Sequence, residues 1–163
     1  MRIKRQPIIA VIGDGNCAPD IYKLAEQTGY LLAKKGARVM CGGYGGVMEA
    51  AAKGAKRGGG LTIGILSGKE RAEANPWIDI PIVTGMRDAR NAVIARTAHG
   101  VIAVSGGYGT LSEISFSLLF QIPVAGIKSW DLRHHNPAKR RLSFPNFTSP
   151  PKAVDFILKS LPR

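Results

Sequence analysis

Two glycine-rich segments of the sequence have the composition of anion-binding turns. Each directly follows an apolar run typical of a strand, and each opens a segment with the pattern of a helix. Glycine tolerates positive φ and lets backbone N–H groups approach a ligand, and a helix N-terminus adds unpaired donors and the positive end of a dipole. A tight turn without a ligand is the alternative for either segment alone. We expect a phosphate-bearing ligand at both turns, at the candidate residues Gly42, Gly43, Gly45 and Gly46 in the first and Gly106, Gly107 and Gly109 in the second.

The second turn continues into Thr110-Leu-Ser-Glu113, and two interpretations of this segment stay open. It matches a capping box, in which Thr110 is the N-cap of a helix and Glu113 is the carboxylate at N3. In the functional interpretation, the Thr110 hydroxyl binds the phosphate and Glu113 points into the cleft as an acid or base.

A third candidate segment is Met86-Arg-Asp-Ala-Arg-Asn91, which follows the fourth predicted strand and begins a helix. Met86 and Arg87 are candidate ligand-binding residues, and Arg87 or Arg90 can clamp a phosphate or carboxylate through two N–H groups. Solvated surface arginines are the alternative. Because the carboxyl ends of parallel strands share one edge of a sheet, we expect at least one of these arginines to face the ligand.

Other kinds of site are disfavoured. After the first predicted strand the chain continues Gly13-Asp-Gly-Asn-Cys17, which lacks the third glycine of the dinucleotide-binding fingerprint, and no Walker A motif occurs. The two cysteines, Cys17 and Cys41, have no metal-ligand spacing. We therefore predict no metal site and no disulfide, and we interpret both cysteines as small, mostly buried residues near strand ends.

The elements that must position these residues alternate between short apolar runs and amphipathic segments, as in βαβ units. The predicted strands are Ile8–Ile12, Arg38–Met40, Leu61–Leu66, Ile80–Val83, Val101–Val104 and Pro123–Ile127. The predicted helices are Pro19–Lys35, Val47–Arg57, Ala89–Ala98, Leu111–Leu119 and Ala153–Leu161. We predict a single α/β domain over residues 1–163, with a Rossmann-like, doubly wound and mostly parallel sheet of six or seven strands. The polar, basic and proline-rich residues 128–150 are predicted to form a surface excursion with a short strand near Leu142–Phe147.

Charge and hydropathy limit the partners. The formal net charge of +12 attracts polyanions, so nucleic acid stays on the list, although no nucleic-acid-binding motif accompanies the charge. No apolar run reaches the ~18 residues that span a bilayer, and the first apolar run is too short for the core of a signal peptide. We expect a cytoplasmic protein that does not contact a membrane.

Three blocks of the sequence resemble the Lonely Guy-like superfamily, whose members are often labelled lysine decarboxylases. The blocks are Cys41–Ala50, Gly85–Asn91 and Gly106–Glu113, and the last is similar to the PGGxGTxxE motif of the superfamily. Together with the order of strands and helices, the resemblance covers about residues 7–127. It implies a homodimer or tetramer, and nothing in it suggests pyridoxal phosphate or decarboxylation.

In the phosphoribohydrolase branch of that superfamily, the enzymes release a free base from a nucleoside 5′-monophosphate. The resemblance implies phosphate binding by Gly107, Gly109 and Thr110. It also implies that Glu113 is the catalytic carboxylate and Arg90 its partner, with no cofactor required. Cleavage of an N-glycosidic bond passes through an oxocarbenium-like state, which a carboxylate stabilises.

The sequence departs from that branch at three places. Ser105 replaces a proline, Val47-Met-Glu49 replaces Leu-Met-Gly, and Asn91 follows Arg90 where the enzymes have lysine. Glu49 and the short chain are more similar to the molybdenum cofactor carrier proteins, which implies the molybdenum cofactor as a bound ligand. Three functions stay open: a phosphoribohydrolase, a carrier without catalysis, and a single-stranded nucleic-acid binder like DNA processing protein A, which has a related core.

Overall fold

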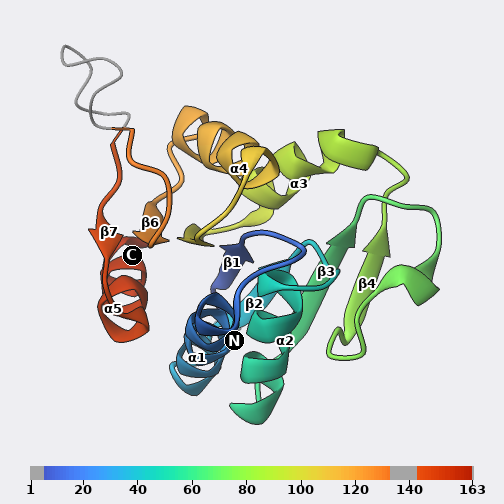
Figure 1. Cartoon of the computed structure of the whole chain (residues 1–163), viewed down its shortest axis with the longest axis horizontal. Coiled ribbons are helices and arrows are strands. Elements are labelled where there is room, and N and C mark those ends of the chain that lie inside the picture. The colour runs from blue at the N-terminus through green and yellow to red at the C-terminus, as the bar shows by residue number, and fades with distance from the viewer. Residues whose placement is uncertain (1–5, 133–142, 163) are drawn as a thin grey trace, which may run out of the picture.

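The computed structural model describes residues 6–132 and 143–162, and their strands form one parallel sheet (Figure 1). The strands are β1 (Ile8–Ile12), β2 (Arg38–Cys41), β3 (Thr62–Leu66), β4 (Ile80–Val83), β5 (Gly100–Val104), β6 (Val124–Ile127) and β7 (Asn146–Phe147). Their order across the sheet is β4-β3-β2-β1-β5-β6-β7, and every neighbouring pair is parallel. The predicted α/β, Rossmann-like fold is confirmed.

Helices cover both faces of this sheet (Figure 1). The described helices are α1 (Pro19–Lys34), α2 (Val47–Arg57), α3 (Arg90–Thr97), α4 (Tyr108–Leu119) and α5 (Pro150–Ser160), with 3-10 turns η1 (Arg71–Glu73) and η2 (Arg87–Ala89). Helices α1, α2 and α5 share one apolar core, which includes Leu32, Val47 and Ile157. Helices α3 and α4 share the other, through Ile94 and Ile114. Burial of both faces explains why the inner strands β1, β5 and β6 are almost continuously apolar.

Two helix starts differ from the sequence prediction. Helix α4 begins at Tyr108 with Gly107 as its N-cap, so Thr110 lies inside the first turn and the predicted Thr110–Glu113 capping box is wrong. The physical reason is that the Gly107 N–H already bonds a side chain from a distant loop, which fixes the helix start earlier. Helix α5 begins at Pro150, three residues before the predicted start, because proline suits the first helical turn.

The segment 128–150 is described only at its two ends. The short strand predicted there is confirmed as β7, which pairs with β6. Phe144 is buried and Trp130 is partly buried against the α3–α4 core, so both ends of the segment contact the domain. The prediction of a surface excursion for residues 133–142 lies outside the described residues. Among the described helices, none has the length and apolar character needed to cross a membrane.

The strand order creates a topological switch point beside the central strand β1. From β1 the chain moves outward through β2, β3 and β4, and it then returns to β5 on the other side of β1. The turns that follow β1, β2 and β5 therefore meet at the carboxyl edge of the sheet. This is the place where open parallel sheets bind ligands.

Candidate functional site

The second glycine turn presents the N-terminus of α4 at the switch point. Ser105 and Gly106 both have positive φ, of 53° and 112°, and they turn the chain sharply from β5 into the helix. The first bond inside α4 runs from the Leu111 N–H to the Gly107 carbonyl, at 3.0 Å. The preceding N–H groups, on Tyr108, Gly109 and Thr110, therefore lie at the open helix end, where an anion can accept from them.

The first glycine turn brings α2 to the same edge. Gly43 and Gly46 have positive φ, of 82° and 61°, and Gly46 is the N-cap of α2. A Cβ on Gly46 would overlap the Asp14 carbonyl oxygen, and a Cβ on Gly45 would lie 3.0 Å from the Gly15 carbonyl oxygen. Glycine is required here by this close approach of the β1–α1 loop.

Asp14 connects the two turns, and it is the site residue that sequence reasoning missed. Its carboxylate accepts the Gly107 N–H at 2.7 Å, and its backbone carbonyl accepts the Val47 N–H at 2.9 Å. One residue of the β1–α1 loop thus binds the starts of both α2 and α4. The available signal was an acidic residue directly after the first strand, in Gly13-Asp-Gly15.

We expect Asp14→Ala to lower the free energy of unfolding by about 1–2 kcal/mol, because the variant loses the acceptor for the Gly107 N–H. Asp14→Asn keeps an acceptor oxygen and should lose clearly less. Urea unfolding of both variants measures the difference. Equal losses in the two variants would mean that the carboxylate charge, and not the hydrogen bond, stabilises the turns.

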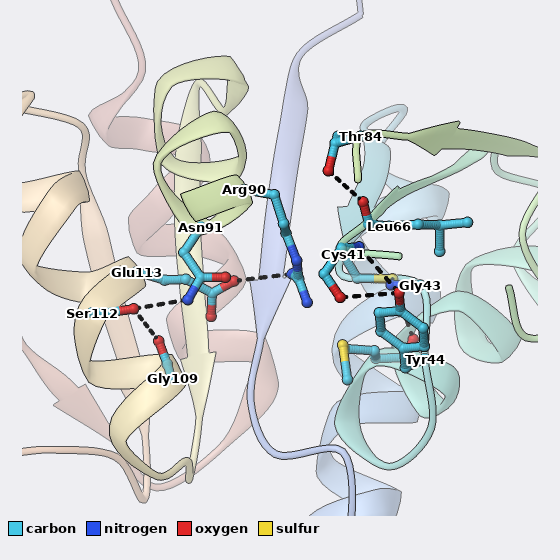
Figure 2. Close-up of polar contacts among 12 residues, drawn as sticks. Cys41, Gly43, Tyr44, Leu66, Thr84, Arg90, Asn91, Gly109, Ser112 and Glu113 are labelled. Carbon is cyan, nitrogen blue, oxygen red and sulfur yellow. Dashed lines mark hydrogen bonds and ion pairs between the residues drawn. The ribbon is translucent and has the colours of Figure 1, made fainter. Parts of the chain in front are cut away.

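Arg90 and Glu113 form the centre of the site, between the two turns (Figure 2). Arg90 Nη1 lies 3.7 Å from Glu113 Oε1, and the side chains are 12% and 9% exposed. Burial raises the pKa of the Glu113 carboxyl to about 7, although the Arg90 guanidinium lowers it in part. Near neutral pH this carboxyl is therefore divided between its protonated and charged forms.

The Arg90 guanidinium is held in place by few protein contacts. Its buried Nε has no hydrogen-bond partner among the described residues. The guanidinium carbon lies 5.9 Å from the centre of the Tyr44 ring, within cation–π range. A Cβ on Gly42 would lie 2.5 Å from Arg90 Nη1, so glycine leaves the space that the arginine occupies. The hydrogen-bonding capacity of Arg90 is thus incompletely used by the protein.

Hydrogen bonds hold the residues next to Arg90 and Glu113 in position. The Tyr44 hydroxyl accepts the N–H groups of Ser67 and Gly68, each at 3.0 Å, and donates to Glu73 at 3.1 Å. Asn91 donates to the Ser112 hydroxyl at 2.8 Å, which links α3 to α4 beside the ion pair (Figure 2). The neutral Asn91–Ser112 hydrogen bond therefore occupies the position at which a lysine is expected in the phosphoribohydrolase branch.

The structure separates the two candidate arginines. Arg90 is mostly buried beside Glu113, whereas Arg87 and Met86 are exposed in the segment that precedes α3. The Arg87 N–H bonds the Ser67 carbonyl at 3.0 Å, and this residue has a positive φ of 49°. Of the two arginines, only Arg90 lies beside Glu113, so Arg90 alone remains the arginine expected to face a ligand.

Neither cysteine is an activated thiol. Cys41 is buried beside the site, where its sulfur accepts the Gly43 N–H and burial raises the pKa of the thiol to about 12. Burial also raises the pKa of Cys17, with a further contribution from Asp14. Among the described residues, no group of three or more His, Cys, Asp or Glu side chains is placed to hold a metal ion.

Fold and site together define a Rossmann-like α/β protein whose two glycine turns meet at one edge of the sheet. The model of the SLOG cluster4 family matches residues 6–150, and the chain belongs to that family. An uncharacterised protein of Archaeoglobus fulgidus is 47% identical over 120 residues, which are 74% of this chain and 79% of that protein. The resemblance to the Lonely Guy-like superfamily is confirmed.

Solved structures extend the likeness over nearly the whole chain. The molybdenum cofactor binding protein of Rippkaea orientalis is 37% identical with a TM-score of 0.87, covering 96% of this chain and 98% of that one. The molybdenum cofactor carrier protein of Chlamydomonas reinhardtii is 30% identical with a TM-score of 0.79, covering 95% and 98%. DNA processing protein A of Streptococcus pneumoniae is 19% identical with a TM-score of 0.72, covering 97% and 62%, which shows a shared fold alone.

Proposed function

We propose that this protein binds a phosphate-bearing pterin or nucleotide at the switch point, and that its ligand is the molybdenum cofactor, which it carries. The observation that carries the proposal is the incompletely partnered Arg90 guanidinium between two glycine turns. A buried cation with an unbonded N–H, next to open donors at a helix N-terminus, is the arrangement expected of a site for an anion. The two similar proteins named for the molybdenum cofactor favour a phosphorylated pterin as that anion.

Each group has a defined part in this proposal. The phosphate accepts from the first-turn N–H groups of α4 and from the Thr110 hydroxyl. Arg90 neutralises the ligand charge, and Glu113 fixes Arg90 from the opposite side. Asp14 is a positioning residue, because it binds the starts of α2 and α4 and acts on the ligand indirectly, by holding the two turns in place.

Gel filtration of the purified protein with molybdenum cofactor tests the proposal. The bound pterin is measured by its fluorescence after oxidation. Arg90→Gln is expected to weaken binding about tenfold or more, because it removes a charge-assisted contact. Arg57→Gln is the matched control, since Arg57 pairs with Glu26 on the surface and should leave binding unchanged. Wild-type protein that retains no pterin would refute the carrier proposal.

A phosphoribohydrolase is the second candidate, and one observation favours it. A carboxyl with a pKa of about 7 beside an arginine can deliver or accept a proton near neutral pH. Chromatography of AMP incubated with the protein, with Glu113→Gln beside it, separates the candidates. Adenine released by the wild type alone would favour the hydrolase. Binding of AMP or pterin without release would favour the carrier.

A further inference from the structure

Tyr108 is an unusual residue for the start of a ligand-binding helix. It directly follows the N-cap Gly107, and it is 83% exposed, although it carries a large aromatic ring. The same helix buries Thr110, Glu113, Ile114 and Ser117. The buried face of α4 thus excludes Tyr108, whose ring is exposed to solvent next to the N–H groups of the first helical turn.

Trp130 supports that ring from the segment after β6. The two ring centres are 6.1 Å apart with planes tilted by 35°. The Trp130 indole N–H donates to the Gly107 carbonyl at 3.3 Å, which joins the indole to the glycine turn itself. The backbone here is also fixed, because Asn146 donates to the Trp130 carbonyl at 2.9 Å and the Ser129 hydroxyl donates to the Ser105 carbonyl at 2.8 Å.

The ring of Tyr108 and the carboxyl of Glu113 leave α4 in different directions. With 3.6 residues per turn, positions 108 and 113 project about 140° apart around the helix axis. Their burial agrees, since the Glu113 side chain is 9% exposed beside Arg90 whereas Tyr108 is open to solvent. A ligand phosphate at the helix end can thus direct the rest of the molecule toward Glu113 or toward Tyr108.

We propose that Tyr108 and Trp130 form a ring-binding ledge, on which the planar heteroaromatic part of the phosphate ligand stacks. This rests on the proposed function, because the phosphate must occupy the N-terminus of α4. Aromatic side chains next to phosphate contacts are used in this way, and stacking tolerates any flat heterocycle, purine or pterin. A ring on the ledge keeps its attachment bond away from Glu113, so the ledge favours holding a ligand over cleaving it.

The test compares AMP with ribose 5-phosphate, which lacks the ring. Tyr108→Ala is expected to weaken AMP binding about tenfold and to leave ribose 5-phosphate within about twofold, because backbone donors are retained. Tyr108→Phe should keep the wild-type affinity for AMP. Leu119→Ala is the matched control, since Leu119 is 71% exposed at the other end of α4. Calorimetric titration measures all four proteins.

The fluorescence of Trp130 provides a second measurement, which reports on the ledge itself. In a Trp77→Phe background, Trp130 is the remaining tryptophan, and its fluorescence should fall on addition of AMP but not of ribose 5-phosphate. Unchanged fluorescence at saturating AMP, or equal losses of the two ligands in Tyr108→Ala, would overturn the ledge while leaving the phosphate site intact. Wild-type protein that binds the molybdenum cofactor but neither AMP nor ribose 5-phosphate would overturn the ledge while leaving the proposed function intact.

Discussion

Gly54→Ala is expected to lower the free energy of unfolding by about 3 kcal/mol, the largest stability loss that we expect from a single methyl group. Helices α1 and α2 cross with their backbones in contact, because each contributes a glycine. A Cβ on Gly54 would overlap the Glu26 carbonyl, and a Cβ on Gly29 would overlap the Ala51 carbonyl. A backbone cannot move aside as a flexible side chain does, so the helices must separate and lose packing along their length.

Urea unfolding measures this loss, and Gly109→Ala provides the matched control. Gly109 is also helical, yet a Cβ there would meet nothing within 4 Å. Alanine has the higher helix propensity, so this control should be neutral or slightly stabilising. Similar losses in the two variants would show that the α1–α2 contact is not the cause.

Glu113→Gln is expected to be more stable than the wild type at pH 8, by up to about 3 kcal/mol, and equally stable at pH 4. The pKa of the Glu113 carboxyl rises from its ordinary value of 4.5 to about 7 on folding, because burial disfavours the charged form. The folded protein thus binds the proton more tightly than the unfolded chain. The stability due to this group is complete below pH 4.5 and is lost as the pH rises through 7.

The measurement is the free energy of unfolding of both proteins from pH 4 to pH 8, read as their difference. Glu73→Gln is a control of opposite sign. Hydrogen bonds from the backbone N–H groups of Glu70 and Lys69 and from the Tyr44 hydroxyl lower the pKa of Glu73. The wild type should therefore be more stable than Glu73→Gln at neutral pH, and this difference in the free energy of unfolding should shrink as the pH falls. A difference between wild type and Glu113→Gln that stays constant with pH would contradict the buried-carboxyl interpretation.

This pH dependence also bears on ligand binding. A negatively charged ligand phosphate beside Arg90 would compete with the Glu113 carboxylate for the guanidinium. Ligand binding is then accompanied by proton uptake at Glu113 near neutral pH.

Local sequence patterns were sufficient for the sheet and for the edge that carries the site. The apolar runs predicted strands β1 and β4 at their observed bounds. For β1 the reason is burial on both faces, which requires nearly continuous apolar sequence. Strand β4 is equally apolar, although it lies at the edge of the sheet and leaves Ile80, Ile82 and Val83 exposed. The glycines of both turns were recognised because positive φ restricts the residue type. Helix α4 was placed too late, since its start depends on the Gly107–Asp14 hydrogen bond, which joins residues 93 positions apart.

The sequence by itself determined which residue types are available at the strand ends, namely two glycine-rich turns, two arginines and one carboxyl. Only the tertiary structure decided which of these residues meet. It placed Arg90 beside Glu113 and left Arg87 on the rim, because the direction of a side chain depends on the packing of α3 against α4. It also brought Asp14 and Trp130 to the second turn, through contacts that cross the sheet between distant segments. The raised pKa of Glu113 has the same origin, since burial is a property of the folded chain and not of any local pattern.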